Sequence, residues 1–113
     1  MVASFIHLYD PYVARPEWWD LYSDDDIDMP RHLEYATDPF GKCVLEGFEA
    51  NLKPLTDEET RRARRAYYAN VSYLDSKIGA LVQTVEQMGQ MDNTILIVTA
   101  DPGDMLGEKR PLV

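Results

Sequence analysis

The first candidate for chemistry is an aspartate placed after an apolar run. Residues 95–98 are four consecutive apolar side chains, three of them β-branched, which is typical of a strand covered on both faces of a parallel sheet. Ligands of such sheets gather where the strands end. Asp101 therefore stands where a carboxylate would reach a metal ion, and Gly103 permits a tight turn there. The alternative is that Asp101 only caps the next turn.

A histidine and further polar residues follow a second predicted strand. Residues 2–8 have an apolar pattern around Phe5 and Ile6, and Pro11 prevents further strand pairing. Parallel strands end at the same edge of a sheet, and the side chains expected at that edge are His7, Tyr9, Asp10, Asp101 and Asp104. A histidine with carboxylates favours metal-assisted hydrolysis of an anionic ester, with His7 as a catalytic residue. A hydrogen-bonded structural role is the alternative for this histidine.

A long helix predicted over residues 57–88 connects the two strands. Thr56 and Glu59 form a capping box, apolar residues recur every three or four positions, and Gly89 ends the helix. Strand, helix and strand make one βαβ unit with a right-handed crossover. The predicted fold class is therefore α/β. Its segments are a strand at 2–8, an irregular loop with a short helix at 9–55, the helix, a strand at 94–100 and a site loop at 101–113.

Other reactive or charged side chains have structural explanations. The arginines at positions 61, 62, 64 and 65 follow an acidic first helical turn and predict a solvated face. Cys43 has no histidine motif beside it and is expected to be a small buried apolar group. The aspartates at 24–28 lack the glycine and glutamate of a calcium-binding EF-hand, so they predict a solvated loop. The aromatic residues near Pro16 predict either packing or a pocket for an organic cation.

Composition restricts the class of partner. The chain has 113 residues, the length of one small domain, and a formal net charge of −9 from 20 acidic and 11 basic side chains. This charge disfavours nucleic acid and anionic membranes and favours a cation or metal ion. A single cysteine excludes an internal disulfide, and no apolar run reaches the roughly 20 residues of a membrane span. The first residues lack a secretion-signal pattern, so we expect a cytoplasmic location.

Several segments together resemble sulfatases of the choline-sulfatase type, in the alkaline-phosphatase superfamily. They are Ser4–His7, Asp10–Glu17, Asp20–Asp24, Asp26–Pro30, Arg61–Tyr73 and Gly103–Glu108. The resemblance implies a partial alkaline-phosphatase-like fold and hydrolysis of choline O-sulfate to choline and sulfate. It also implies a divalent metal, expected to be calcium, and a formylglycine nucleophile made from a cysteine in a Cys-x-Pro-Ser-Arg motif. The metal would neutralise charge on the sulfate oxygens.

The resemblance assigns roles to two residues and marks two departures beside them. The family pattern after the second strand is similar to Ser-Asp-His/Asn-Gly-Asp, so Asp101 matches a metal ligand while Pro102 replaces its neighbour. After the first strand the pattern is similar to His-Pro-His-Asp-Pro-Tyr. His7 matches the first histidine, and Tyr9 stands in place of the second.

The remaining catalytic apparatus of the family has no match in this sequence. Cys43 is followed by Val44, Leu45 and Glu46 rather than by the formylglycine motif, and Lys109 is at the wrong offset for the lysine that contacts sulfate. We therefore expect a central fragment of a longer enzyme, inactive alone. The alternatives are a non-catalytic remnant that binds a partner or itself through an exposed sheet edge, and a phosphatase or phosphodiesterase of the same superfamily.

Overall fold

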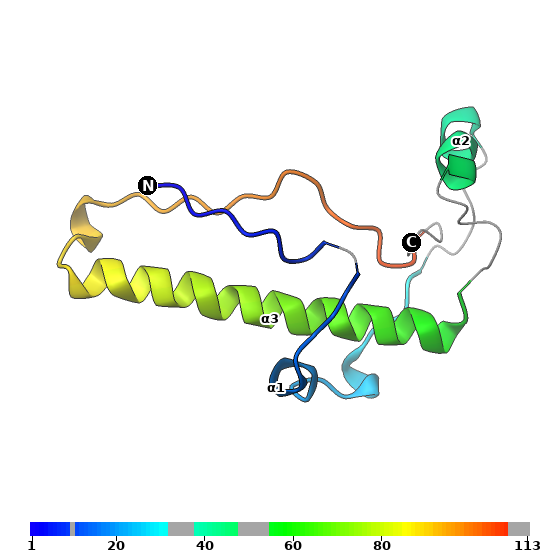
Figure 1. The fold of residues 1–113 in the computed structure, drawn as a ribbon, viewed down its shortest axis with the longest axis horizontal. Helices are drawn as coiled ribbons and strands as arrows, with labels where there is room; N and C mark the ends of the chain where they lie inside the picture. Colours follow the sequence, from blue (N-terminus) through cyan, green and yellow to red (C-terminus); the bar gives the residue numbers. More distant parts are fainter. Residues whose placement is uncertain (10, 32–37, 48–54, 109–113) are drawn as a thin grey trace.

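One long helix forms the spine of the structure. The computed structural model describes residues 1–9, 11–31, 38–47 and 55–108. Its elements are α1 (Pro16–Trp19), the 3-10 turn η1 (Asp24–Asp26), α2 (Pro39–Gly47), α3 (Asp57–Gln87) and the 3-10 turn η2 (Met91–Asn93). The segments before α1 and after η2 extend along α3, whereas α2 stands apart from it (Figure 1). The radius of gyration is 17.6 Å, against about 13 Å for a compact domain of this length.

Helix α3 begins at the capping box that the sequence predicts. The Thr56 hydroxyl accepts a hydrogen bond from the Glu59 amide (3.2 Å), and Glu59 Oε2 accepts one from the Thr56 amide (2.9 Å). Three acidic residues in the first turn favour the positive end of the helix dipole. At the other end Gly89 has a φ of 64°, a left-handed conformation that glycine adopts without the strain of a Cβ atom. The helix therefore spans almost the whole predicted range of 57–88.

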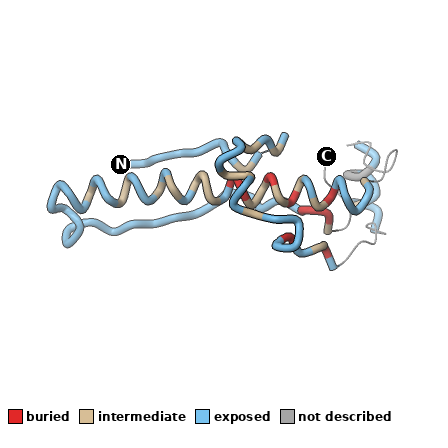
Figure 2. Tube along the Cα trace, turned by 90° about the horizontal axis from the view of Figure 1, so that it is seen from below, coloured by how far each residue is buried: buried red, intermediate tan, exposed pale blue. Residues whose placement is uncertain are grey.

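The core is small and lies against the first half of α3. Its buried apolar side chains are Ile27, Ala66, Ala69 and Leu106. Every buried residue of α3 lies between Thr60 and Asn70, and Figure 2 shows buried positions only along that part of the helix. The loop around Ile27 and the segment around Leu106 therefore pack on the same stretch of α3, which brings residues from three parts of the chain together.

The predicted strands at 2–8 and 94–100, and with them the βαβ unit, are wrong. Within the described residues neither segment is a strand, and no backbone ladder joins them. Both segments run above α3 in Figure 1, and Figure 2 shows them separated, one to each side of the helix axis. The apolar residues are consequently exposed, Ile6 by 84% and Ile97 by 80%. An apolar, β-branched segment has side chains that suit a sheet, but it becomes a strand only if a neighbouring strand accepts and donates its backbone hydrogen bonds.

Two further expectations need correction. Without a sheet in the described residues, the exposed sheet edge expected to mediate self-association does not exist there. Cys43 is exposed on α2 instead of being a buried apolar group. The segment 9–55, expected to be an irregular loop with a short helix, contains two helices in its described residues, α1 and α2. In the described part of the chain, no helix is long and apolar enough to cross a membrane.

The cap at Thr56 gives a test of the α3 boundary. We expect Thr56→Ala to lower the free energy of unfolding by about 1 kcal/mol, because the Glu59 amide loses its acceptor. Urea unfolding followed by helical circular dichroism measures this change. Thr84→Ala is the matched control, since the Thr84 hydroxyl bonds only the Ala80 carbonyl inside the helix and its loss should cost nothing. Equal stability of Thr56→Ala and the unchanged chain would contradict the cap.

Candidate functional site

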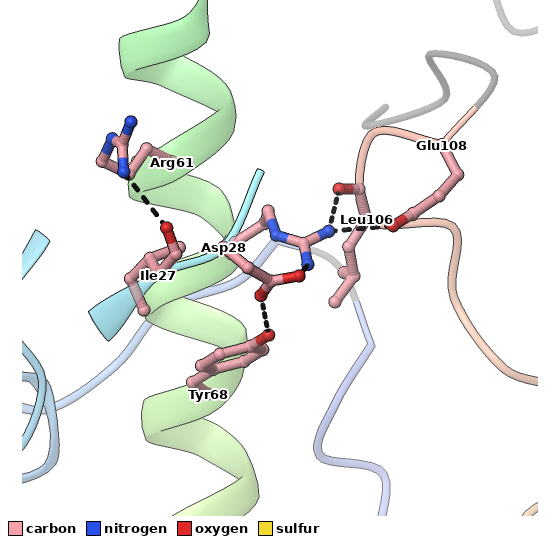
Figure 3. A network of polar contacts seen from close by, with 7 residues as sticks. Ile27, Asp28, Arg61, Tyr68, Leu106 and Glu108 are labelled. Carbon is pink, nitrogen blue, oxygen red and sulfur yellow. Dashed lines mark hydrogen bonds and ion pairs between the residues drawn. The ribbon is translucent and has the colours of Figure 1, made fainter. Parts of the chain in front are cut away.

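A buried guanidinium group joins the three parts of the chain that meet on α3. Arg64 is 4% exposed. Its Nη1 donates to the Leu106 carbonyl oxygen (2.8 Å) and to Glu108 Oε1 (3.0 Å), and its Nη2 donates to Asp28 Oδ2 (2.9 Å). Figure 3 shows Asp28 on one side of this network and Leu106 with Glu108 on the other. One side chain of α3 thus holds both the 24–28 loop and the 104–108 segment.

A second residue of α3 completes the contacts of Asp28. The Tyr68 hydroxyl donates to Asp28 Oδ1 (Figure 3). This hydrogen bond, followed by that from Arg64, holds the pKa of Asp28 below its usual value of 3.8. The same bond is the main cause that raises the pKa of Tyr68 above 10.0. Burial by itself would lower the pKa of Arg64, but its hydrogen bonds to Asp28 and Glu108 outweigh burial and raise it.

Two more arginines bind the acidic loop, so the expected solvated arginine face is wrong for three of its four members. Arg61 Nη1 donates to the carbonyl oxygens of Asp24 (3.0 Å) and Ile27 (3.1 Å). Arg65 Nη1 donates to Asp24 Oδ1 (3.0 Å), and its guanidinium lies 4.4 Å from the ring centroid of Trp19. Arg62 alone among the four is exposed. The aspartate loop is therefore held by α3 through backbone and carboxylate oxygens together.

A tyrosine connects the start of the chain to the predicted site loop. The Tyr12 hydroxyl donates to Asp104 Oδ2 (3.1 Å), and the Tyr12 ring meets that of Tyr67 edge to face at 5.5 Å. Burial, and then the negative charge of Asp104, raises the pKa of Tyr67. Asp104, three residues after Asp101, is thereby anchored to Tyr12, whose ring in turn packs against Tyr67 of α3.

His7 lies against α3 in an aromatic group. Its ring centroid is 4.8 Å from that of Tyr73, which also meets Trp18 at 5.9 Å. The next residue, Leu8, has a φ of 81°, an uncommon backbone conformation for a residue with a side chain. Lys77 Nζ lies 5.1 Å from the Tyr73 centroid. Because Lys77 already approaches the ring of Tyr73 and Arg65 that of Trp19, the aromatic residues support packing rather than an open pocket for an organic cation.

Asp101, the predicted metal ligand, belongs to no metal-binding cluster in the described residues. Asp101 is exposed, and no three histidine, cysteine or acidic side chains lie close enough to hold a metal ion in the part of the chain that the structure describes. Of the residues expected at one sheet edge, Asp10 lies outside the described residues, Tyr9 is 70% exposed, and Asp104 is bonded by Tyr12. The donor set present here therefore does not fit a calcium ion, which takes about six to eight oxygen ligands.

Sequence reasoning missed Arg64 because arginine usually signals a solvated surface. One signal was available in the pattern. Arg64 directly follows Ala63 and stands three positions before Tyr67. Ala63 and Tyr67 are four positions apart and belong to the recurring apolar positions of the helix, so the aliphatic stem of Arg64 starts beside them. Its carboxylate partners lie 36 and 44 residues away, and no local spacing predicts such pairs.

The Asp28 contacts predict an acid-sensitive link. A carboxyl whose pKa is lowered on folding stabilises the folded state above its unfolded pKa, near 3.8, and that contribution is lost as pH falls through the lowered value. We expect the unfolding free energy to fall less steeply below pH 4 in Asp28→Asn than in the unchanged chain. Urea unfolding of both chains between pH 2.5 and 7 tests this. Parallel curves would show that the Asp28 contacts add no pH-dependent stability.

The ligand count predicts the outcome of a calcium titration. We expect isothermal calorimetry of the 113-residue chain with calcium to show no saturable heat, because Asp101 alone offers too few oxygen ligands. Asp101→Asn is the comparison, and both chains should give the same dilution heats. A saturable site that disappears in Asp101→Asn would contradict this expectation.

Comparison with known proteins agrees with the resemblance found in the sequence. The family profile for sulfatases matches residues 22–112. The choline-sulfatase of Rhizobium meliloti (strain 1021) is 39% identical over 112 residues, which are 96% of this chain and 22% of that protein. An arylsulfatase of Clostridium perfringens (strain 13 / Type A) is 25% identical over 105 residues, 93% of this chain and 22% of that protein.

A third relative extends the comparison to the wider superfamily. It is the multifunctional alkaline phosphatase superfamily protein PehA of Trinickia caryophylli, 26% identical over 92% of this chain and 24% of that protein. No solved structure matches the chain. The chain thus spans less than a quarter of the length of these three relatives. Sulfatases generally use a divalent metal and a formylglycine. The match over residues 22–112 shows that this chain belongs to the sulfatase family.

Proposed function

We propose that this chain supplies part of the catalytic domain of a choline-sulfatase, which hydrolyses choline O-sulfate to choline and sulfate. The observation that carries the proposal is the 39% identity to the Rhizobium meliloti choline-sulfatase across 96% of the chain. PehA, named as a multifunctional protein of the alkaline phosphatase superfamily, is less similar at 26%. Because the more similar relative is named as a choline-sulfatase, we favour a sulfate ester over a phosphate ester as substrate.

Within that enzyme we assign two residues of this chain to the site. Asp101 would be one ligand of the divalent metal, which we expect to be calcium, because it is a carboxylate at the start of a loop anchored on α3. His7 would be a catalytic residue, held against Tyr73 in a ring contact. The metal would supply positive charge to the sulfate oxygens.

The nucleophile and most of the metal ligands are not among these assignments. The sequence contains one cysteine, Cys43, without the formylglycine motif, and in the described residues no cluster of three or more histidine, cysteine or acidic side chains could hold a metal ion. What this chain contributes is a scaffold that positions two polar side chains. The isolated chain should therefore be inactive.

A segment exchange tests the proposed function. Residues 1–113 replace the matched segment of the Rhizobium meliloti choline-sulfatase, and sulfate release from choline O-sulfate is measured. We expect low turnover, because Tyr9 and Pro102 offer no imidazole. Combining Tyr9→His with Pro102→His should raise kcat/KM by at least about tenfold, and Asp101→Asn in that background should abolish activity.

The controls of this exchange separate the alternatives. Asp92→Asn, in η2 and exposed, should leave turnover unchanged, and the isolated 113-residue chain should give no more sulfate than a buffer blank. Activity that is unaffected by Asp101→Asn would refute the ligand role. A preference of the exchanged enzyme for a phosphate monoester over choline O-sulfate would favour the phosphatase alternative.

A further inference from the structure

We propose that Arg64 is a positioning residue for the loop 101–108, and that it sets where Asp101 stands relative to His7. The inference rests on the sulfatase function proposed above, because that function gives those two residues their roles. The observation behind it is that one nearly fully buried guanidinium binds the backbone and a side chain of this loop from helix α3.

The anchors of the loop all lie on one side of Asp101. After it come Asp104, bonded by Tyr12, and then Leu106 and Glu108, bonded by Arg64. Before it, residues 95–98 are between 56% and 89% exposed. In the described chain, the placement of Asp101 therefore depends on contacts made C-terminal to it, and Arg64 makes two of those contacts.

The same helix also holds His7. Tyr73, whose ring contacts His7, lies nine residues after Arg64 on α3, which corresponds to about 14 Å along a straight helix. Helix α3 thus acts as a rigid rod between the loop that carries Asp101 and the ring that holds His7. Loss of the Arg64 contacts would free one end of this arrangement without disturbing the other.

Two features of Arg64 make this role specific to a guanidinium. Its Nη1 and Nη2 bind partners on two different segments at once, whereas a lysine has a single ammonium nitrogen. The buried Nε of Arg64 has no hydrogen-bond partner. The orientation of the guanidinium group therefore satisfies the Nη1 and Nη2 contacts and leaves Nε unpaired. We therefore expect lysine at this position to keep part of the restraint, and methionine none of it.

The experiment measures backbone order in the loop by nitrogen-15 relaxation of the full 113-residue chain. In the unchanged chain the amides of Leu106 and Gly107 should be rigid, with order parameters near about 0.85, and in Arg64→Met they should fall below about 0.6. Arg64→Lys should give intermediate values. Arg62→Met, from an exposed arginine of the same helix, should match the unchanged chain. Equal order in Arg64→Met and the unchanged chain would overturn the proposal.

A second pair of variants keeps the test valid if Arg64→Met fails to fold. Glu108→Ala removes one branch of the network, the acceptor of the Arg64 hydrogen bond, and leaves Arg64 and Leu106 in place, so the loop amides should lose order. Asp28→Ala removes the acceptor of the opposite branch, so the loop should keep its order while the 24–28 segment loosens. Identical loop order in these two variants would contradict separate branches and overturn the proposal.

Activity is measured separately in the segment-exchanged choline-sulfatase with Tyr9→His and Pro102→His. There we expect Arg64→Met to lower kcat per active site by at least about tenfold, with partial recovery in Arg64→Lys and no change in Arg62→Met. Full turnover of Arg64→Met would overturn the positioning role. If the exchanged enzyme is inactive even with Arg64 present while the relaxation results hold, the proposed function fails and the anchoring of the loop stands.

Discussion

The structure depends on the cost of burying the charge of Arg64. A guanidinium removed from water is unfavourable unless hydrogen bonds and opposite charges replace its hydration. Here the replacements come from Asp28, Leu106 and Glu108, far from Arg64 in the sequence. The charge thus requires its partners to stay in place. The core, which has four buried apolar side chains among the described residues, gains a specificity that so few apolar contacts would not supply alone.

This requirement shows what the sequence could and could not predict. The capping box at Thr56 and the extent of α3 follow from local chemistry, since each partner lies within one turn of the other. The prediction of two strands was wrong because the apolar run at 95–98 indicates that a segment could join a sheet, but does not identify the neighbouring strand with which it would form hydrogen bonds. Arg64 was missed for the same reason: its carboxylate partners are distant in sequence, and a rule based on neighbouring charges assigned it to water.

The same distinction between local and long-range information applies to the candidate site. Membership of the sulfatase family, shown by the match over residues 22–112, was recognisable from short segments of the sequence. The placement of Asp101 and His7 was expected from a shared sheet edge, whereas the structure relates them through contacts with α3. The roles of the two residues stay predictions, and the element that relates them changes from a sheet to a helix. Only long-range contacts could reveal that exchange.

The exposed run at 95–98 has a consequence for the behaviour of the chain in concentrated solution. Four apolar residues, rich in β-branched side chains and free of proline, charge and glycine, have the composition of segments that stack into intermolecular cross-β fibrils. Asp92 before the run and Asp101 after it are charges of the kind that flank such segments as gatekeepers and oppose stacking. Asp101 would then oppose aggregation through the same negative charge that suits it to bind a metal. Neutralising this charge would make the chain more prone to aggregate.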